Sequence, residues 1–76
     1  MAIAYVLITT APGQDKSVYD TLLQMGLSEV NELSGEYSAI VKIEASSHIK
    51  VGEIVVNRIR TIKGVIDTKT LTGIKF

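Results

Sequence analysis

The sequence predicts a single α+β domain, in which a four-stranded antiparallel sheet is covered on one face by two helices. Four segments are rich in apolar and β-branched residues, which favour strands. Two further segments repeat apolar residues at the spacing of an amphipathic helix. These segments follow one another as strand, helix, strand, strand, helix, strand, and a chain of 76 residues has the length of one domain.

The first strand is expected over residues 2–9, where nearly every residue is apolar or β-branched. Alternate residues of a strand point to opposite faces of the sheet. Both faces of this strand are therefore apolar: one carries Ile3, Tyr5 and Leu7, the other Ala4, Val6 and Ile8. The strand ends at Pro12 and Gly13, because proline cannot continue a central ladder and glycine relaxes the next bend.

The first helix is expected from Asp15 to about Met25. Val18 and Leu22 join Met25 in a stripe at helical spacing, so one face of the helix is apolar. Asp15 suits an N-cap or a first-turn anion, and Gly26 suits the residue that follows the helix.

A second and more polar strand is expected over residues 27–34, as an edge of the sheet. The third strand, residues 37–45, alternates clearly and belongs at the centre. Between them the chain reverses in a hairpin at Gly35, because glycine adopts a positive φ without a Cβ penalty. This hairpin places Tyr37 and Ser38 at the start of the third strand.

The second helix follows a cap at Ser46 or Ser47 and runs to about Ile62, and Gly64 ends it. Its apolar stripe consists of Val51, Val55, Ile59 and Ile62. The β-branched residues in this stripe have low helix propensity, so the helix depends on packing against the sheet.

The last strand is expected over residues 65–74 and is rich in threonine. Thr68, Thr70 and Thr72 recur at period 2, so they share one face of the strand. With right-handed crossovers, the order of elements then gives the ferredoxin-like βαββαβ fold.

The composition predicts that this chain forms at least a dimer. A short chain buries a small fraction of its surface, and without cysteine no disulfide can add stability. Apolar residues make up 46% of the chain and the mean hydropathy is +0.29, which is rich for so small an interior. Two helices cover only one sheet face, whereas the first strand is apolar on both. We therefore expect dimerisation through the other face.

Several classes of function are disfavoured by composition. Eight basic and eight acidic residues leave no net charge, which argues against direct nucleic-acid binding. No apolar run approaches the ~20 residues of a membrane span, and the N-terminus lacks the basic region of a signal peptide. We therefore expect a cytoplasmic protein without a membrane partner. With no cysteine and one histidine, we expect neither a metal site nor a cofactor.

The residues for catalysis are few. His48, the single histidine, falls in the first turn of the second helix, where an imidazole is usually solvated. Glu29 and Glu32 are the nearest pair of carboxylates, but in a regular strand they face opposite sides of the sheet. The loop after the first strand lacks the arginine of an acyl-phosphate hydrolase. A small dimeric ferredoxin-like enzyme, of the monooxygenase or isomerase type, stays open as the alternative, with His48 in a deep pocket as its signature.

The residues for binding are better represented. A hairpin corner with a glycine, a tyrosine and a serine offers backbone groups and hydroxyls to a small ligand. The threonines of the last strand add hydroxyls that both donate and accept hydrogen bonds. Such groups suit a small zwitterion, although turns and strands also favour these residue types for structural reasons alone.

Six short motifs, in order along residues 2–74, resemble the effector-binding domain of the Lrp/AsnC transcriptional regulators, known as the RAM domain. These motifs are Ala4-Tyr5-Val6-Leu7-Ile8, Pro12-Gly13, Ser34-Gly35-Glu36-Tyr37, Ile40-Val41-Lys42-Ile43, Ile59-Arg60-x-Ile62-x-Gly64-Val65 and Asp67-Thr68-x-Thr70. The resemblance implies a ferredoxin-like domain that dimerises through its sheets. It also implies assembly of the dimers into octamers or decamers, with amino-acid effectors bound between dimers.

The resemblance further implies which residues contact the effector. These residues are Gly35, Glu36, Tyr37 and Ser38 in the hairpin corner and Thr68 and Thr70 in the last strand. Gly35 would contribute backbone contacts and the others side-chain contacts. The family usually has an aspartate where this chain has Ser38, so the usual acceptor for an effector's ammonium group is absent from that position.

Regulators of this family also carry a helix-turn-helix domain. Because the first strand begins directly after Met1, we expect no such DNA reader on this chain. The resemblance therefore predicts a non-enzymatic module that binds an amino acid and co-assembles with full-length regulators. A purely structural assembly subunit, which ignores small molecules, is a third hypothesis.

Overall fold

The computed structural model describes residues 2–27 and 29–72. Its elements are β1 (Ala2–Thr10), α1 (Asp15–Leu23), β2 (Glu29–Glu32), β3 (Ala39–Ala45), α2 (His48–Ile54), the π-helical turn η1 (Val55–Ile59) and β4 (Val65–Thr72). This is the predicted order of strands and helices. Gly73 and Ile74, where we expected the last strand to end, lie outside the described residues.

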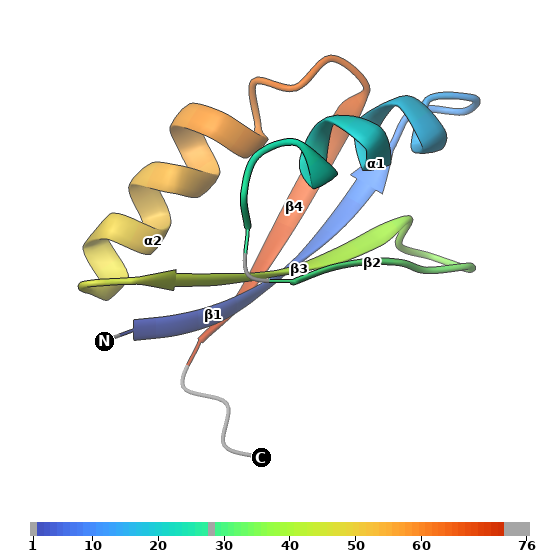
Figure 1. Cartoon of the computed structure of the whole chain (residues 1–76). Coiled ribbons are helices and arrows are strands. Elements are labelled where there is room, and N and C mark those ends of the chain that lie inside the picture. Colours follow the sequence, from blue (N-terminus) through green and yellow to red (C-terminus); the bar gives the residue numbers. More distant parts are fainter. Residues whose placement is uncertain (1, 28, 73–76) are drawn as a thin grey trace.

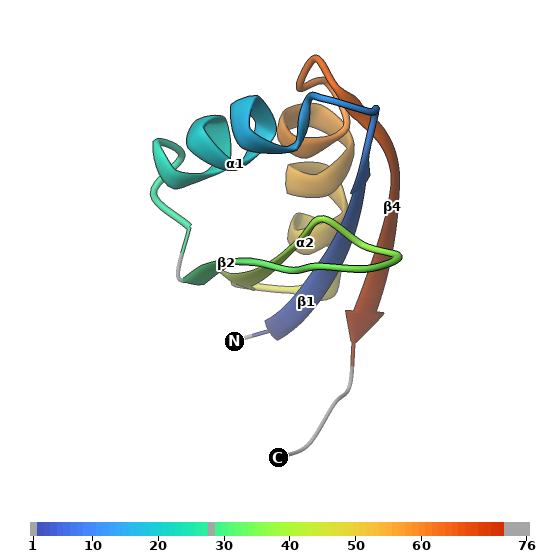
Figure 2. The same cartoon turned by 90° about the vertical axis from the view of Figure 1, so that its right-hand side faces the viewer.

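The four strands form one sheet in the order β2-β3-β1-β4, and every neighbouring pair is antiparallel. The strands β1 and β3 are therefore central, and β2 is an edge strand, as its polar sequence predicts. Both helices lie on the same side of the sheet (Figures 1 and 2). The prediction of a ferredoxin-like fold is thus confirmed.

The hydrophobic core lies between the helices and this side of the sheet. Alternate residues of the two central strands face it, as their period-2 pattern predicts. Its fully or nearly fully buried members are Ala2, Ala4, Val6, Ile8, Val18, Leu22, Ala39, Val41, Ile43, Val51, Val55 and Ile59. The stripes expected on the two helices are therefore the faces that hold them on the sheet.

Several element boundaries differ from the prediction. The helix α1 ends at Leu23 rather than near Met25, because the Met25 N–H bonds to the Leu22 carbonyl in a tighter turn at 3.1 Å. The strand β2 is shorter than expected, and β3 begins at Ala39 rather than Tyr37. The hairpin connection therefore covers residues 33–38, closed by a hydrogen bond of 2.9 Å from the Leu33 N–H to the Ser38 carbonyl.

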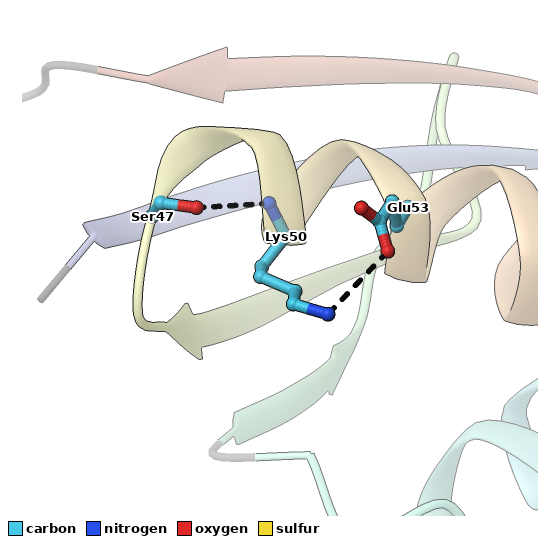
Figure 3. A network of polar contacts seen from close by, with 3 residues as sticks. All are labelled: Ser47, Lys50 and Glu53. Atoms are coloured by element: carbon cyan, nitrogen blue, oxygen red, sulfur yellow. Dashed lines mark hydrogen bonds and ion pairs between the residues drawn. The ribbon is translucent and has the colours of Figure 1, made fainter.

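The start of α2 is capped as the sequence predicts. The Ser47 hydroxyl oxygen accepts a hydrogen bond from the Lys50 N–H at 3.2 Å, which satisfies one free donor of the first turn (Figure 3). Lys50 also forms an ion pair with Glu53, one turn further along, at 3.6 Å. Both side chains of this pair are exposed, so it adds little to stability.

The predicted second helix continues past Ile54, but in π-helical rather than α-helical form. In η1 the Arg60 N–H bonds to the Val55 carbonyl, five residues earlier, at 2.9 Å. The Thr61 hydroxyl donates to the carbonyls of Asn57 and Arg58 at 3.2 and 3.3 Å, which satisfies groups at the end of the turn. Val55 stays buried in this wider turn, in keeping with the predicted apolar stripe.

The other face of the sheet is covered by neither helix (Figure 2). We call it the open face and define its centre by Tyr5, Leu7, Ile40 and Leu71. Tyr5 lies opposite Leu71 and Leu7 opposite Ile40, so apolar residues are neighbours across three strands. Ile3 on the same face is 42% exposed. The strand β1 is therefore apolar on both faces, as predicted, while the fold buries only one of them.

Candidate functional site

A groove with a volume of about 370 Å³ lies between the loop after β1 and the hairpin connection before β3. We call it the hairpin groove. Its lining residues are Thr10, Ala11, Pro12, Gly13, Asp15, Leu33, Ser34, Gly35, Tyr37 and Ser38. Because β3 runs antiparallel to β1, the end of β1 and the start of β3 meet at one end of the sheet (Figure 1).

The hairpin side of the groove is held by backbone geometry. The Ser38 N–H donates to the Ile8 carbonyl at 2.8 Å, which ties the connection to the central strand. Gly35 has a φ of 117°, in the region that favours glycine, so the predicted reason for glycine at this corner is confirmed. Tyr37 and Ser38 are half-buried, and their hydroxyl-bearing side chains line the groove.

Two hydroxyl groups join the two sides of the groove. Thr10 Oγ1 and Ser38 Oγ lie 2.7 Å apart and are partly buried, and either can be the donor. The pairing of β1 with β4 shifts register between Thr9 and Thr10, and such irregularities re-aim side chains. One hydroxyl donates its proton to the other in this hydrogen bond. The second hydroxyl proton and the remaining lone pairs stay available, so the pair can still donate to and accept from a ligand.

The loop after β1 is clamped against the start of β4. The Ala11 N–H donates to the Gly64 carbonyl at 2.8 Å, and the Gln14 N–H donates to the Ala11 carbonyl at 3.0 Å. A Cβ on Gly64 would lie 2.9 Å from Gln14 Cβ, so only glycine permits this approach. Asp15, the first residue of α1, is thereby placed on the groove.

Over residues 2–27 and 29–72, the lining of the groove is mostly polar and carries a single charged side chain. Asp15 supplies that negative charge, while Thr10, Ser34, Tyr37 and Ser38 supply hydroxyls. No arginine, lysine or histidine in the described part of the chain lines the groove, so a phosphate or another strong anion would find no positive partner among these residues. The groove therefore suits a small molecule with a positive group and further hydrogen-bonding groups.

The structure brings together only part of the residue set predicted from the sequence. Gly35, Tyr37 and Ser38 line the hairpin groove, whereas Glu36 is exposed on the same turn and does not. Thr68 lies opposite Ile8 on β4, which flanks β1 on the side away from β3.

Thr70 lies opposite Val6, two residues further from the groove than Thr68. Within one chain, neither threonine reaches the groove. Their pairing partners are core residues on the helix side of the sheet, so the prediction that Thr68, Thr70 and Thr72 share one face is confirmed.

The loop after β1, which its sequence identifies only as a turn, also lines the hairpin groove. Thr10 and Asp15 are the members with chemistry, and Pro12 and Gly13 shape the wall. The signal that identifies them is topological. In an antiparallel pair, the residues that follow one strand lie beside those that precede the other.

The residues considered for catalysis, His48, Glu29 and Glu32, do not line the hairpin groove. His48 is exposed at the start of α2. Glu29 lies opposite Lys42 and Glu32 opposite Ala39, on opposite faces, as predicted.

Over residues 2–27 and 29–72, no cluster of three or more acidic or histidine side chains is arranged to hold a metal ion. In the same residues, no helix has both the length and the apolar character of a membrane span.

No family model matches the chain. Its sequence is 35% identical over 74 residues to an uncharacterised HTH-type transcriptional regulator of Pyrococcus furiosus, which covers 92% of this chain and 49% of the regulator. The chain thus spans about half the length of the curated regulators it matches. A stretch of 62 residues is also 39% identical to homocitrate synthase of Sulfolobus acidocaldarius, covering 74% of this chain but only 13% of that enzyme.

Solved structures match the whole fold. FFRP-DM1 superposes with a TM-score of 0.88 at 31% identity, over 97% of this chain and 100% of FFRP-DM1. Escherichia coli AsnC gives a TM-score of 0.87 at 21% identity, over 99% of this chain and 52% of AsnC. A transcriptional regulator of Neisseria meningitidis, solved as a complex with L-Met, gives 0.81 at 12% identity, over 97% of this chain and 50% of the regulator. The last two likenesses concern the fold alone.

Proposed function

The chain belongs to the Lrp/AsnC family of transcriptional regulators, in which it corresponds to the effector-binding RAM domain, and we propose that it binds an amino-acid effector and assembles into a homo-oligomer. Effector binding in this proposal changes the assembly, and the assembly modulates transcription. The module acts by binding and has no catalytic role of its own.

The observation that carries the proposal is the chemistry of the hairpin groove. A free amino acid needs acceptors for its ammonium group and donors for its carboxylate. The groove supplies a carboxylate in Asp15 and hydroxyls in Thr10, Tyr37 and Ser38, beside the apolar side chain of Leu33. Its volume of about 370 Å³ falls within the range of about 300–1,000 Å³ typical of small-molecule sites. The complex of the N. meningitidis regulator with L-Met supports an amino acid as the class of ligand.

In this proposal the site is completed by a second copy of the chain. Glu36, Thr68 and Thr70 are predicted to contact the effector but do not line the groove of their own chain. An effector bound between dimers would contact both the groove residues and these three residues, because the groove of one protomer then faces the threonine hydroxyls of another. The effector thereby stabilises the contact between dimers.

The dimer itself forms through the open face. Tyr5, Leu7, Ile40 and Leu71 give this face an apolar centre, and burying it in a second copy removes apolar surface from water. Charged residues of both signs surround that centre. Lys42, Glu29 and Glu44 lie on the side of β3 and β2, and Lys69 and Asp67 lie on the side of β4. A two-fold axis can therefore pair unlike charges across the interface. Four or five such dimers would close into the octamer or decamer.

The proposed function also indicates which proteins this chain binds. The chain co-assembles with full-length Lrp/AsnC regulators, whose own effector-binding domains have the same fold, and so changes their ring size or their affinity for DNA. With a net charge of zero it makes no direct contact with nucleic acid. This role places it in the cytoplasm, with the regulators that it modifies.

Native mass spectrometry with and without a pool of the common L-amino acids tests the proposal. We expect dimers and higher even-numbered assemblies, with a shift in their distribution when the effector is present. Thermal-shift screening of single amino acids identifies the effector. A ligand at about 100-fold over its dissociation constant adds about 2.7 kcal/mol, which raises Tm by roughly 11–22 °C in a domain of this size. Monomers alone, together with no stabilisation by any amino acid, would refute the proposal.

A further inference from the structure

We propose that Asp15 is the anchor for the effector's ammonium group, and that its charge makes the hairpin groove select amino acids with neutral or basic side chains over acidic ones. This inference rests on the proposed function. It assigns a binding role to a residue that lies outside the hairpin corner and outside β4. It also gives the ligand a chemical class, because it states which charge the ligand must carry.

Among the described residues that line the groove, Asp15 alone is charged, and its neighbours there are hydroxyl, glycine and apolar residues. From these described residues, a ligand that enters therefore meets one formal negative charge and no formal positive charge. An ammonium group gains from this field, and an additional carboxylate on the ligand's side chain loses by it.

Asp15 begins α1 at the end of a hydrogen-bonded turn. Its backbone follows directly after Gln14, whose N–H is bonded to the Ala11 carbonyl, and Ala11 is bonded in turn to Gly64. The carboxylate is thus carried by a clamped turn at the start of α1. Within residues 2–27 and 29–72, no ion pair or side-chain hydrogen bond holds the Asp15 carboxylate. The anion is therefore placed on the groove and available to a ligand.

An amino acid anchored at Asp15 still needs donors for its carboxylate, and the groove offers the hydroxyls of Tyr37, Ser34 and the Thr10–Ser38 pair. Hydroxyls are neutral donors, so they accommodate the single carboxylate without attracting strong anions. Leu33 and Pro12 lie beside these groups and suit a small aliphatic side chain.

The test is isothermal titration calorimetry on the wild type and three variants of the full chain. Asp15→Asn removes the charge with little change in shape, and Asp15→Glu keeps the charge. Asp20→Asn is the matched control, because Asp20 is also exposed on α1 but does not line the groove. The probes are the common L-amino acids and the N-acetyl derivative of each one that binds, since acetylation removes the ammonium charge.

We expect Asp15→Asn to weaken the best neutral amino acid about tenfold, which corresponds to about 1.4 kcal/mol. Asp15→Glu should restore most of the affinity, and Asp20→Asn should leave it unchanged. On the wild type, the N-acetyl derivative should bind about tenfold more weakly than the free amino acid. On Asp15→Asn that difference should shrink to about twofold or less. Aspartate and glutamate should bind the wild type at least about tenfold more weakly than their amides.

The outcomes separate this inference from the proposed function. If the wild type binds an amino acid and Asp15→Asn binds it equally well, the inference is overturned and the proposed function stands. The same conclusion follows if both proteins discriminate equally against the N-acetyl derivative. If the wild type binds no amino acid at all, the proposed function fails and this inference fails with it. Native mass spectrometry of each variant shows whether the assembly has changed, so that a loss of affinity is not mistaken for a loss of the oligomer.

Discussion

Replacing Gly64 by alanine tests how the groove is held to the rest of the fold. Gly64 has a φ of 103°, and a Cβ at this residue would lie 2.9 Å from both Gln14 Cβ and Val18 Cγ2. Its carbonyl accepts the hydrogen bond from the Ala11 N–H that clamps the loop after β1. One added methyl group therefore presses on the start of α1, on a core side chain and on a wall of the hairpin groove.

Two costs add up in the Gly64→Ala variant. A left-handed backbone costs a residue with a Cβ about 1–2 kcal/mol. Overpacking of a well-packed site costs typically about 1–3 kcal/mol, and here relief is limited because Gln14 Cβ is fixed to the backbone of the helix. We expect a loss of about 2–5 kcal/mol in the free energy of unfolding. A loss of about 2 kcal/mol alone lowers Tm by roughly 8–16 °C in a domain of this size.

Urea unfolding at a fixed protein concentration measures the effect, since the stability of an oligomer depends on concentration. Gly35→Ala is the matched control, because Gly35 has a φ of 117° but a Cβ there would have no atom within 4 Å. It should lose only the backbone cost of about 1–2 kcal/mol. Equal losses of unfolding free energy in the two variants would show that the close approach of Gly64 to α1 adds no cost to the Gly64→Ala substitution. If the unfolding free energy of Gly64→Ala equalled that of the wild type, neither the backbone cost nor the overpacking cost would hold.

Three further predictions concern the cap, the open face and the hairpin corner. Ser47→Ala should lower the free energy of unfolding by about 1 kcal/mol, because the Lys50 N–H loses its acceptor at 3.2 Å, and an unchanged Tm would contradict this. Leu7→Asp places a charge at the centre of the open face, so native mass spectrometry should show monomers with unchanged circular dichroism; persisting dimers would exclude this face as the interface. Ser38→Asp adds a second negative charge to the groove, so calorimetry should show a shift in preference towards lysine and arginine, and an unchanged preference would remove Ser38 from the site.

The fold was predictable because local patterns and packing agree. The period-2 alternation of β1 and β3 predicts which residues face the helices, and those residues are buried. The stripe through Val51, Val55 and Ile59 likewise predicts the buried face of the second helix. The wider turn of η1 was not predictable from that stripe, because residues four apart lie near each other in both helical forms.

The site was only half predictable, for a reason of distance along the chain. Gly35, Tyr37 and Ser38 stand out locally as a hairpin corner with hydroxyls, and they do line the groove. Thr10 and Asp15 look locally like a strand end and a helix start. Thr10 meets Ser38 across 28 positions in sequence, and this contact follows from the pairing of β1 with β3 rather than from any local pattern.

The placement of the groove relative to the open face explains how one small domain can link binding to assembly. The strand β1 carries both features: Tyr5 and Leu7 lie on the open face, while Ile8 and Thr10 anchor the hairpin by hydrogen bonds to Ser38. Under the proposed function the effector contacts residues of more than one protomer, so it binds the assembled form more tightly than the separate chains. Linkage is reciprocal, and the factor by which assembly raises effector affinity must equal the factor by which the effector tightens assembly. Titrating the effector at several protein concentrations therefore measures one coupling energy in two independent ways, and a disagreement between them would exclude a site shared between protomers.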